Sequence, residues 1–146
     1  MTDFLYVSHP QVKIDPAVPV PRWGLSDVGR ARARAFAAGF DLSRYRRIVS
    51  STEEKAKETA VLLAEVLRLS VDVRADMEEN DRSATGYLPE AEFQQMADAF
   101  FARPQESVRG WERAADAQAR IVAAVEATLA DAVATIFVGH GGVGTL

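Results

Sequence analysis

Hydrophobic and polar positions follow two alternating periods along the chain, and this pattern predicts strands that alternate with helices. Short apolar runs typical of strands lie at residues 4–7, 47–50, 71–74 and 134–138. Apolar residues at helical spacing fill the segments between them, with starts predicted near Ser26, Ser51, Pro89 and Val108. Strand–helix alternation favours a parallel sheet covered on both faces. The predicted fold class is α/β, a three-layer αβα sandwich with a mostly parallel central sheet.

Local signals predict where several of these elements begin. Residues 10–21 contain four prolines and are expected to form an extended loop, because proline interrupts helices. Ser26 is predicted to cap the next helix, whose buried face is expected to carry residues at helical spacing: Val28, Ala31, Ala35 and Phe36. Ser51 and Glu54 match a capping box for the helix after that. A later helix is predicted from about residue 108 to 131.

Length, composition and charge limit the class of protein. The 146 residues are 48% hydrophobic and 26% charged, which predicts one globular domain over residues 1–146. A net charge of −4 argues against binding to nucleic acid or to an anionic membrane. The absence of cysteine excludes disulfides and thiolate nucleophiles. No apolar run approaches the roughly 20 residues of a transmembrane helix, and no signal peptide is evident, so a cytoplasmic location is expected.

The only two histidines directly follow predicted strands. His9 ends the first of these strands and His140 ends the last. Ligands of parallel α/β sheets bind beyond the carboxyl ends of the strands, so a shared site is expected for the two imidazoles. The alternative interpretation is a pair of unrelated turn histidines, which would be the better one for a single histidine. The position of both at strand ends favours the shared site.

Other strand ends add polar groups to the same edge. The second strand leads into a helix start, where free N–H groups favour an anion, and Lys55 lies one turn further. The third leads to the acidic segment 77–82, and the glycines at 141–142 allow close approach of backbone N–H groups. Together these groups favour phosphoryl transfer through histidine. The alternatives are a surface lysine paired with Glu54 or Glu58, and a solvated acidic loop.

Four ordered segments of the chain resemble the histidine phosphatase superfamily, also called phosphoglycerate-mutase-like. Residues 4–10 resemble its first strand and Arg-His-Gly triplet, with His9 at the nucleophile position. Residues 25–29 are similar to the Leu-Thr-Glu-x-Gly start of its first helix, and residues 50–60 to its Ser-Ser-Pro-x-x-Arg-Ala-x-x-Thr-Ala motif. Residues 138–142 carry His140 at the position of the second histidine. The similarity covers nearly the whole chain.

The resemblance implies a mechanism without metal or cofactor. His9 would take the phosphoryl group, and His140 would bind and neutralise the phosphoryl oxygens. Glu79, placed at the acid position by the family's Leu-x-Glu pattern, would protonate the leaving oxygen and then assist water. Glu78 and Asp81 remain alternatives for this acid, because the cluster allows a shift in register. The implied partner is a small phosphorylated substrate or inorganic phosphate.

The chain departs from the family pattern at the phosphate-binding positions. Ser8 replaces the arginine before the nucleophile, and Pro10 replaces the glycine after it, which removes a backbone donor. Lys55 replaces a second arginine and loses its planar two-pronged contact. Arg22 is expected to approach the site in compensation, with Arg82 as its substitute; both have the alternative of being surface arginines. The expected phosphate-binding residues are Ser8, Arg22, Lys55, Arg82 and Gly141.

The sequence therefore predicts a phosphatase that hydrolyses a small phosphomonoester through phosphohistidine, with activity weakened or altered in specificity by the missing arginine. One alternative is a non-catalytic phosphate-binding or regulatory protein of the same fold. A metal-dependent hydrolase is disfavoured, because neither histidine belongs to an H-x-x-x-H or H-x-H pair. The chain ends six residues after His140, where the family continues with a helix and further sheet. The family's C-terminal portion is therefore expected to be missing.

Overall fold

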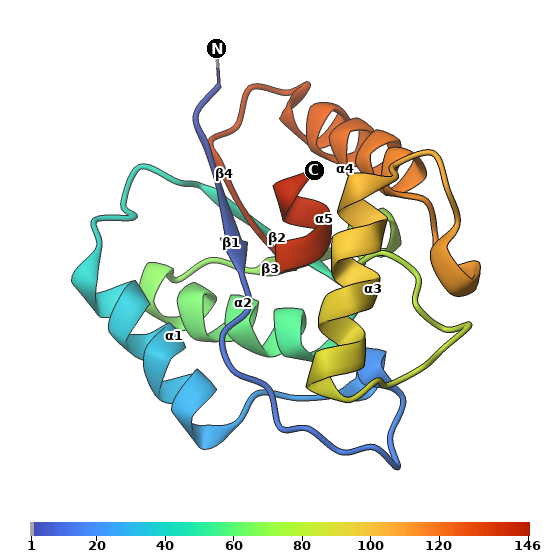
Figure 1. Ribbon diagram of the computed structural model, residues 1–146. Helices are drawn as coiled ribbons and strands as arrows, with labels where there is room; N and C mark the ends of the chain where they lie inside the picture. The colour runs from blue at the N-terminus through green and yellow to red at the C-terminus, as the bar shows by residue number, and fades with distance from the viewer. Residues whose placement is uncertain (1) are drawn as a thin grey trace.

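A sheet of parallel strands forms the centre of the computed structural model, which describes residues 2–146 (Figure 1). Within this range the four strands are β1 (Phe4–Ser8), β2 (Arg47–Ser51), β3 (Val71–Arg74) and β4 (Thr135–Gly139). Their order in the sheet is β1-β4-β2-β3, and every neighbouring pair is parallel. The predicted α/β class is confirmed. Because the first and last strands are neighbours, the two histidines that follow them are brought to one edge.

Helices cover both faces of this sheet. The α-helices of residues 2–146 are α1 (Asp27–Gly39), α2 (Glu54–Leu67), α3 (Glu90–Ala102), α4 (Ala114–Leu129) and α5 (Gly141–Thr145). Three single turns of 3-10 helix are η1 (Val20–Arg22), η2 (Ala75–Met77) and η3 (Val108–Gly110). In Figure 1, α1 and α2 lie on one side of the sheet and α3, α4 and α5 on the other. None of these helices is long and apolar enough to cross a membrane.

The alternation of side chains along the strands places the two largest clusters of the core on opposite faces of the sheet. Ile48 and Ile136 face α2, where they pack with Ala56 and other residues of that helix. Val49 and Phe137, one position further along each strand, face the opposite side and pack with residues of α3, α4 and α5. Successive strand residues point to opposite faces of a sheet, which explains this division. The two clusters make the predicted three-layer arrangement.

The buried face of α1 differs from the prediction. Ser26 caps the helix as expected, since its hydroxyl accepts a hydrogen bond of 3.0 Å from the Gly29 N–H. However, Val28 is half exposed, and the buried residues are smaller ones: Gly29, Ala33 and Ala37. A Cβ atom at Gly29 would overlap the carbonyl oxygen of Gln11. The rotation of α1 therefore follows from close approach to the proline-rich loop, and not from the largest apolar side chains.

The helix predicted from residue 108 begins later than expected. The chain makes only the η3 turn there, and α4 starts at Ala114. Arg109 and Gly110 have positive φ angles of 48° and 82°, in the left-handed region. A right-handed helix cannot continue through this conformation, which explains the interruption. By contrast, α3 begins directly after Pro89, as predicted.

Candidate active site

The two histidines meet at the carboxyl edge of β1 and β4. Their ring centroids are 5.4 Å apart, with the planes inclined by 66°. The parallel pairing continues past the end of β1, where the His9 N–H donates to the Gly139 carbonyl oxygen at 3.1 Å. The backbone of two neighbouring strands therefore holds both imidazoles at the same place.

His9 is held in the tautomer that a nucleophile needs. Its Nδ1 lies 2.8 Å from the Pro10 carbonyl oxygen. A carbonyl oxygen only accepts, so Nδ1 carries the proton and Nε2 keeps a free lone pair. Burial lowers the pKa of His9 below its ordinary value, and the positive charge of Lys55 acts in the same direction. The ring is therefore neutral and capable of attack near neutral pH.

His140 is buried and held by contacts from two other elements. Its Nε2 lies 2.7 Å from the Ser51 hydroxyl and 3.0 Å from a carboxylate oxygen of Glu53. Its backbone N–H donates to the Tyr6 hydroxyl at 2.9 Å. Burial lowers the pKa of His140 to about 4, although the charges of Glu53 and Glu79 act in the opposite direction. This imidazole is therefore neutral in the free protein at neutral pH.

The predicted capping box at Ser51 and Glu54 is wrong. Ser51 is the last residue of β2, and Glu53 precedes the first turn of α2 without a capping hydrogen bond from its side chain. The Ser51 hydroxyl contacts His140 across the sheet. A tertiary contact to the neighbouring strand end has replaced the local one that the spacing predicted.

Glu53 is a site residue that the sequence analysis missed. It is only 5% exposed, and its carboxylate lies 3.2 Å from Lys55 Nζ and accepts the Glu79 N–H at 2.9 Å, besides contacting His140. Burial alone would raise the pKa of Glu53, but His140, Lys55 and the Glu79 amide together lower it. The family motif leaves this position unspecified, and an acid at a helix start is usually solvated. Only its closeness to a strand end pointed toward the site.

Lys55 belongs to the site and is not a surface lysine. Lys55 is only 4% exposed. Its Nζ donates to the Val20 carbonyl oxygen at 2.7 Å and also forms an ion pair with Glu53. The two acids considered as surface partners, Glu54 and Glu58, pair with other side chains. The first turn of α2 thus directs one buried cation toward the histidines.

Glu79 and Arg82 come from the loop that follows β3. The Glu79 carboxylate accepts the N–H groups of Gly142 at 2.9 Å and Val143 at 2.6 Å, at the start of α5. Arg82 lies 3.3 Å from the same carboxylate, and its guanidinium carbon is 4.8 Å from the centre of the Phe93 ring. Burial lowers the pKa of Arg82, against the opposite effects of Glu79 and Glu53.

The two alternative acids are more exposed than Glu79. The side chain of Glu79 is 15% exposed, whereas Glu78 and Asp81 are exposed residues. Glu78 accepts a hydrogen bond from the Thr52 hydroxyl, and Asp81 accepts the Ser83 N–H at 2.8 Å. Of the three, Glu79 is the one enclosed between α5 and an arginine.

These groups share one large cavity of about 1150 Å³. It is lined by the residues described above, among others: His9, Glu53, Lys55, Glu79, Arg82 and His140. Pockets for small molecules usually measure about 300–1,000 Å³, so the cavity holds more than a phosphate group. Among residues 2–146, no three histidine, aspartate or glutamate side chains form a group that could hold a metal ion.

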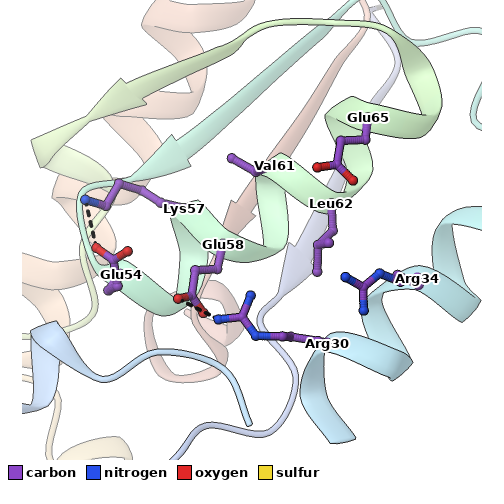
Figure 2. Close-up of a pocket in the computed structure, with 8 residues that line it drawn as sticks. All are labelled: Arg30, Arg34, Glu54, Lys57, Glu58, Val61, Leu62 and Glu65. Atoms are coloured by element: carbon purple, nitrogen blue, oxygen red, sulfur yellow. Dashed lines mark ion pairs between the residues drawn. The ribbon is translucent and has the colours of Figure 1, made fainter. Parts of the chain in front are cut away.

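A second, smaller cavity lies between α1 and α2 and contains none of the predicted site residues (Figure 2). Its volume is about 320 Å³, and charged side chains line it. Figure 2 shows two ion pairs there, Arg30–Glu58 at 2.9 Å and Lys57–Glu54 at 3.0 Å. We call this cavity the α1–α2 groove. Its charges largely neutralise one another on an open helical surface.

Comparison with known proteins assigns the chain to a family. The family model of the histidine phosphatase superfamily (branch 1) matches residues 18–146. The chain belongs to this family. A search of curated protein sequences found no significant match. The matched range includes three of the four resembling segments, 25–29, 50–60 and 138–142, and the resemblance of the chain to this superfamily is thereby confirmed.

Several solved structures have the same histidine phosphatase fold. A mycobacterial glucosyl-3-phosphoglycerate phosphatase in its native form is 24% identical, with a TM-score of 0.84 over 98% of this chain and 76% of its own. Its complex with inorganic phosphate is 25% identical, with a TM-score of 0.79 over 98% and 75%. Bacillus stearothermophilus YhfR is 21% identical, with a TM-score of 0.76 over 96% and 74%.

Three expected phosphate-binding residues of this histidine phosphatase superfamily member do not line the large cavity. Arg22 is exposed, because the neighbouring Trp23 turns inward and donates its indole N–H to the Asp15 carbonyl oxygen at 2.9 Å. Ser8 is also exposed, since alternation along β1 directs it away from the face of His9. A Cβ atom at Gly141 would lie 3.7 Å from the Ser8 hydroxyl, which places both residues together outside the cavity.

Proposed function

We propose that this protein is a phosphatase that hydrolyses a small phosphomonoester through a phosphohistidine formed on His9. The observation that supports this function best is the pair of imidazoles in one cavity, with ring centroids 5.4 Å apart and with His9 Nδ1 at 2.8 Å from the Pro10 carbonyl oxygen, which leaves Nε2 for attack. The family membership supports the same chemistry, as does the similar fold of a mycobacterial phosphatase that was solved with inorganic phosphate. The proposed reaction uses neither metal nor cofactor.

The first step transfers the phosphoryl group to the protein. Nε2 of His9 attacks phosphorus, and a P–N bond forms as the ester P–O bond breaks. Glu79, which takes up a proton when the ester binds, gives this proton to the leaving oxygen, so that a neutral alcohol departs. Lys55, Arg82 and His140 line the same cavity and would stabilise the phosphoryl oxygens.

The second step releases inorganic phosphate. A water molecule attacks phosphorus, and the carboxylate of Glu79 accepts one of its protons. The P–N bond breaks, and its electron pair returns to His9 Nε2. Glu79 is then protonated again and His9 is free. As phosphate leaves, Glu79 gives its proton to solvent and returns to the carboxylate that pairs with Arg82 in the free protein.

Binding of the ester changes the charge of the site. In the free protein, the Glu53 carboxylate contacts Lys55 and His140. The Glu79 carboxylate pairs with Arg82 and accepts backbone N–H groups at the start of α5. A phosphate dianion competes with these carboxylates for the same donors. It also favours the charged form of His140, so we expect the protein to take up a proton as it binds phosphate.

Trapping of the intermediate tests this function. With an aryl phosphate labelled at phosphorus, acid-labile and alkali-stable label should accumulate on the protein, and a chelator should leave turnover unchanged. His9→Gln should remove the label and reduce turnover by about 10³-fold or more, because the nucleophile is lost. Arg34→Ala, in the α1–α2 groove, is the matched control and should retain both. Turnover in His9→Gln equal to that of the wild type would reject the proposal.

A second candidate is a protein that binds phosphate without hydrolysing it. The observation in its favour is that carboxylates of the chain already pair with the cations nearest the histidines, which weakens the site for a transition state rich in negative charge. Vanadate or phosphate binding without any labelled intermediate would support this function over the first.

A further inference from the structure

The large cavity is lined by apolar residues as well as by charged ones. Two segments supply the apolar residues: 11–23, which follow His9, and 83–93, which follow the acidic segment 77–82. These apolar residues include a partly exposed set: Val12, Ile14, Val18, Tyr87 and Leu88. We call this set the apolar shelf. Ile14 is 59% exposed and Tyr87 40%, which is unusual for large apolar or aromatic residues that line a cavity.

The apolar shelf is preformed. Trp23 lies behind it, 7% exposed, with its ring centre 5.6 Å from that of Tyr87. The indole N–H of Trp23 is bonded to the carbonyl oxygens of Asp15 and Val18 within its own loop, so the ring presents no unmatched polar atom to the cavity. Three prolines restrict the backbone between residues 16 and 21. A ligand would therefore meet an ordered apolar surface at little cost in loop entropy.

The charged residues that line the cavity include an excess of acids. Six carboxylates line the cavity: Glu53, Glu78, Glu79, Asp81, Glu90 and Glu112. Only three lysine or arginine side chains do so, and each of them has a carboxylate partner: Lys55 with Glu53, Arg82 with Glu79, and Arg120 with Glu112. The phosphate of a substrate already competes for two of these cations. A second anionic group on the substrate would face carboxylates, and each lysine or arginine of the cavity already has a carboxylate partner.

From this cavity we infer that the substrates are monoesters of apolar, uncharged alcohols, and that esters whose alcohol carries a carboxylate are rejected. This inference rests on the proposed function. The phosphate lies against the histidines, the organic part lies on the apolar shelf, and the surplus acids exclude a second negative charge by repulsion.

Three esters test the inference: 2-naphthyl phosphate, glycerol 3-phosphate and 3-phosphoglycerate. Glycerol 3-phosphate and 3-phosphoglycerate have nearly the same size and differ in one carboxylate, so their kcat/KM ratio measures the effect of charge. We expect it to favour glycerol 3-phosphate by at least about tenfold. Tyr87→Ala should lower the ratio of kcat/KM for the naphthyl ester to that for glycerol 3-phosphate by about ten- to thirtyfold, because stacking area is lost. Ile14→Ser should lower it in the same direction.

Phe40→Ala is the matched control, since this aromatic residue is 62% exposed and does not line the cavity. It should leave the ratio unchanged. A preference for 3-phosphoglycerate, or for the cationic ester phosphocholine over 2-naphthyl phosphate, would overturn the inference. An unchanged ratio in both Tyr87→Ala and Ile14→Ser would also overturn it.

Binding of phosphonates separates the inference from the proposed function, because these analogues cannot be hydrolysed. Calorimetry should give at least about tenfold tighter binding for 2-naphthylmethylphosphonate than for methylphosphonate, and the weakest binding for phosphonoacetate. This order without hydrolysis of any ester would support the ligand class and reject the phosphatase. Hydrolysis of the esters without this order of binding would support the phosphatase and reject the ligand class. The absence of both phosphonate binding and ester hydrolysis would reject the phosphatase and the ligand class together.

Discussion

Charged residues line both the α1–α2 groove and the large cavity, but the two regions hold their charges in different ways. In the groove, the side chains of Lys57 and Glu54 are 41% and 45% exposed. In the cavity, those of Lys55 and Glu53 are 5% and 6% exposed, although the two pairs are neighbours on the same helix start. Exposed ion pairs are worth little because water competes for both charges, whereas buried ones interact strongly and are costly to break.

The difference arises from what surrounds each pair. The groove charges lie on the solvent side of two helices. The Glu53–Lys55 pair faces the strand ends, where His140 and the Glu79 N–H are additional partners. A composition of acids and bases does not by itself mark a functional site. Burial at the carboxyl edge of a parallel sheet, with backbone donors directed at the carboxylates, distinguishes the cavity from the groove.

The largest expected effect comes from removing the buried carboxylate. Glu53→Gln leaves Lys55 and His140 without their anion, so the free energy of unfolding should fall by about 3–5 kcal/mol. Phosphate should restore stability to this variant more than to the wild type, because the dianion replaces the lost charge. Urea denaturation with and without phosphate measures both quantities.

Glu54→Gln is the matched control for this experiment, since it removes the adjacent, exposed acid of the groove. The expected change is below about 1 kcal/mol and should shrink further at high salt. Equal losses for the two variants would show that the distinction between the regions is wrong.

A smaller effect is expected on anion binding. Arg82→Ala should weaken vanadate binding by about 1.5–3 kcal/mol, the range for a hydrogen bond to a charged group, because Arg82 lines the cavity. Arg34→Ala, which removes an arginine from the groove, should have no effect, and neither should Arg22→Ala. Isothermal titration with vanadate provides the measurement. Weaker binding in Arg34→Ala would instead place an anion site between α1 and α2.

The smallest effect, counted per pH unit and per histidine, is the dependence of stability on pH. His9 and His140 both have lowered pKa values in the folded protein, so the unfolded chain binds more protons below its ordinary histidine pKa of about 6.5. Stability should therefore be fully present above about pH 6.5 and fall as the pH decreases toward about 4, by at most about 1.4 kcal/mol per pH unit for each histidine. Glu53 and Glu79, which favour the charged imidazole, oppose this trend, and Lys55 supports it.

His140→Gln should reduce this slope, and urea denaturation at pH 5, 6 and 7 measures it. The groove contains no histidine, so Lys57→Ala should leave the slope unchanged. A slope as steep in His140→Gln as in the wild type would mean that His140 is already charged in the folded protein.

Several features of the site could be predicted from the chain alone. The apolar runs of 4–7 and 134–138 locate His9 and His140 at strand ends, and the parallel arrangement then places them at one edge. Lys55 follows from its position in the first turn of the helix after β2. Each of these inferences needs only the local spacing of apolar residues and the rule that parallel strands end at the same edge of a sheet.

Other features depended on contacts between distant segments. The sequence predicts that Arg22 compensates for Ser8, but the inward turn of Trp23 directs Arg22 outward. Ser51 matched a capping box, yet its hydroxyl contacts His140, 89 residues away. Glu53 had no sequence signal at all beyond its place near a strand end.

By itself the sequence determined the order of strands and helices, the family, and the two histidines at one sheet edge. The tertiary structure decided which charges are buried, which carboxylate pairs with which cation, and which loop side chains form the apolar shelf. Periodicity follows from the geometry of one element and can be read locally. The burial of a charge depends on all the segments that exclude water from it, and the packing of those segments is set only when the whole chain has folded.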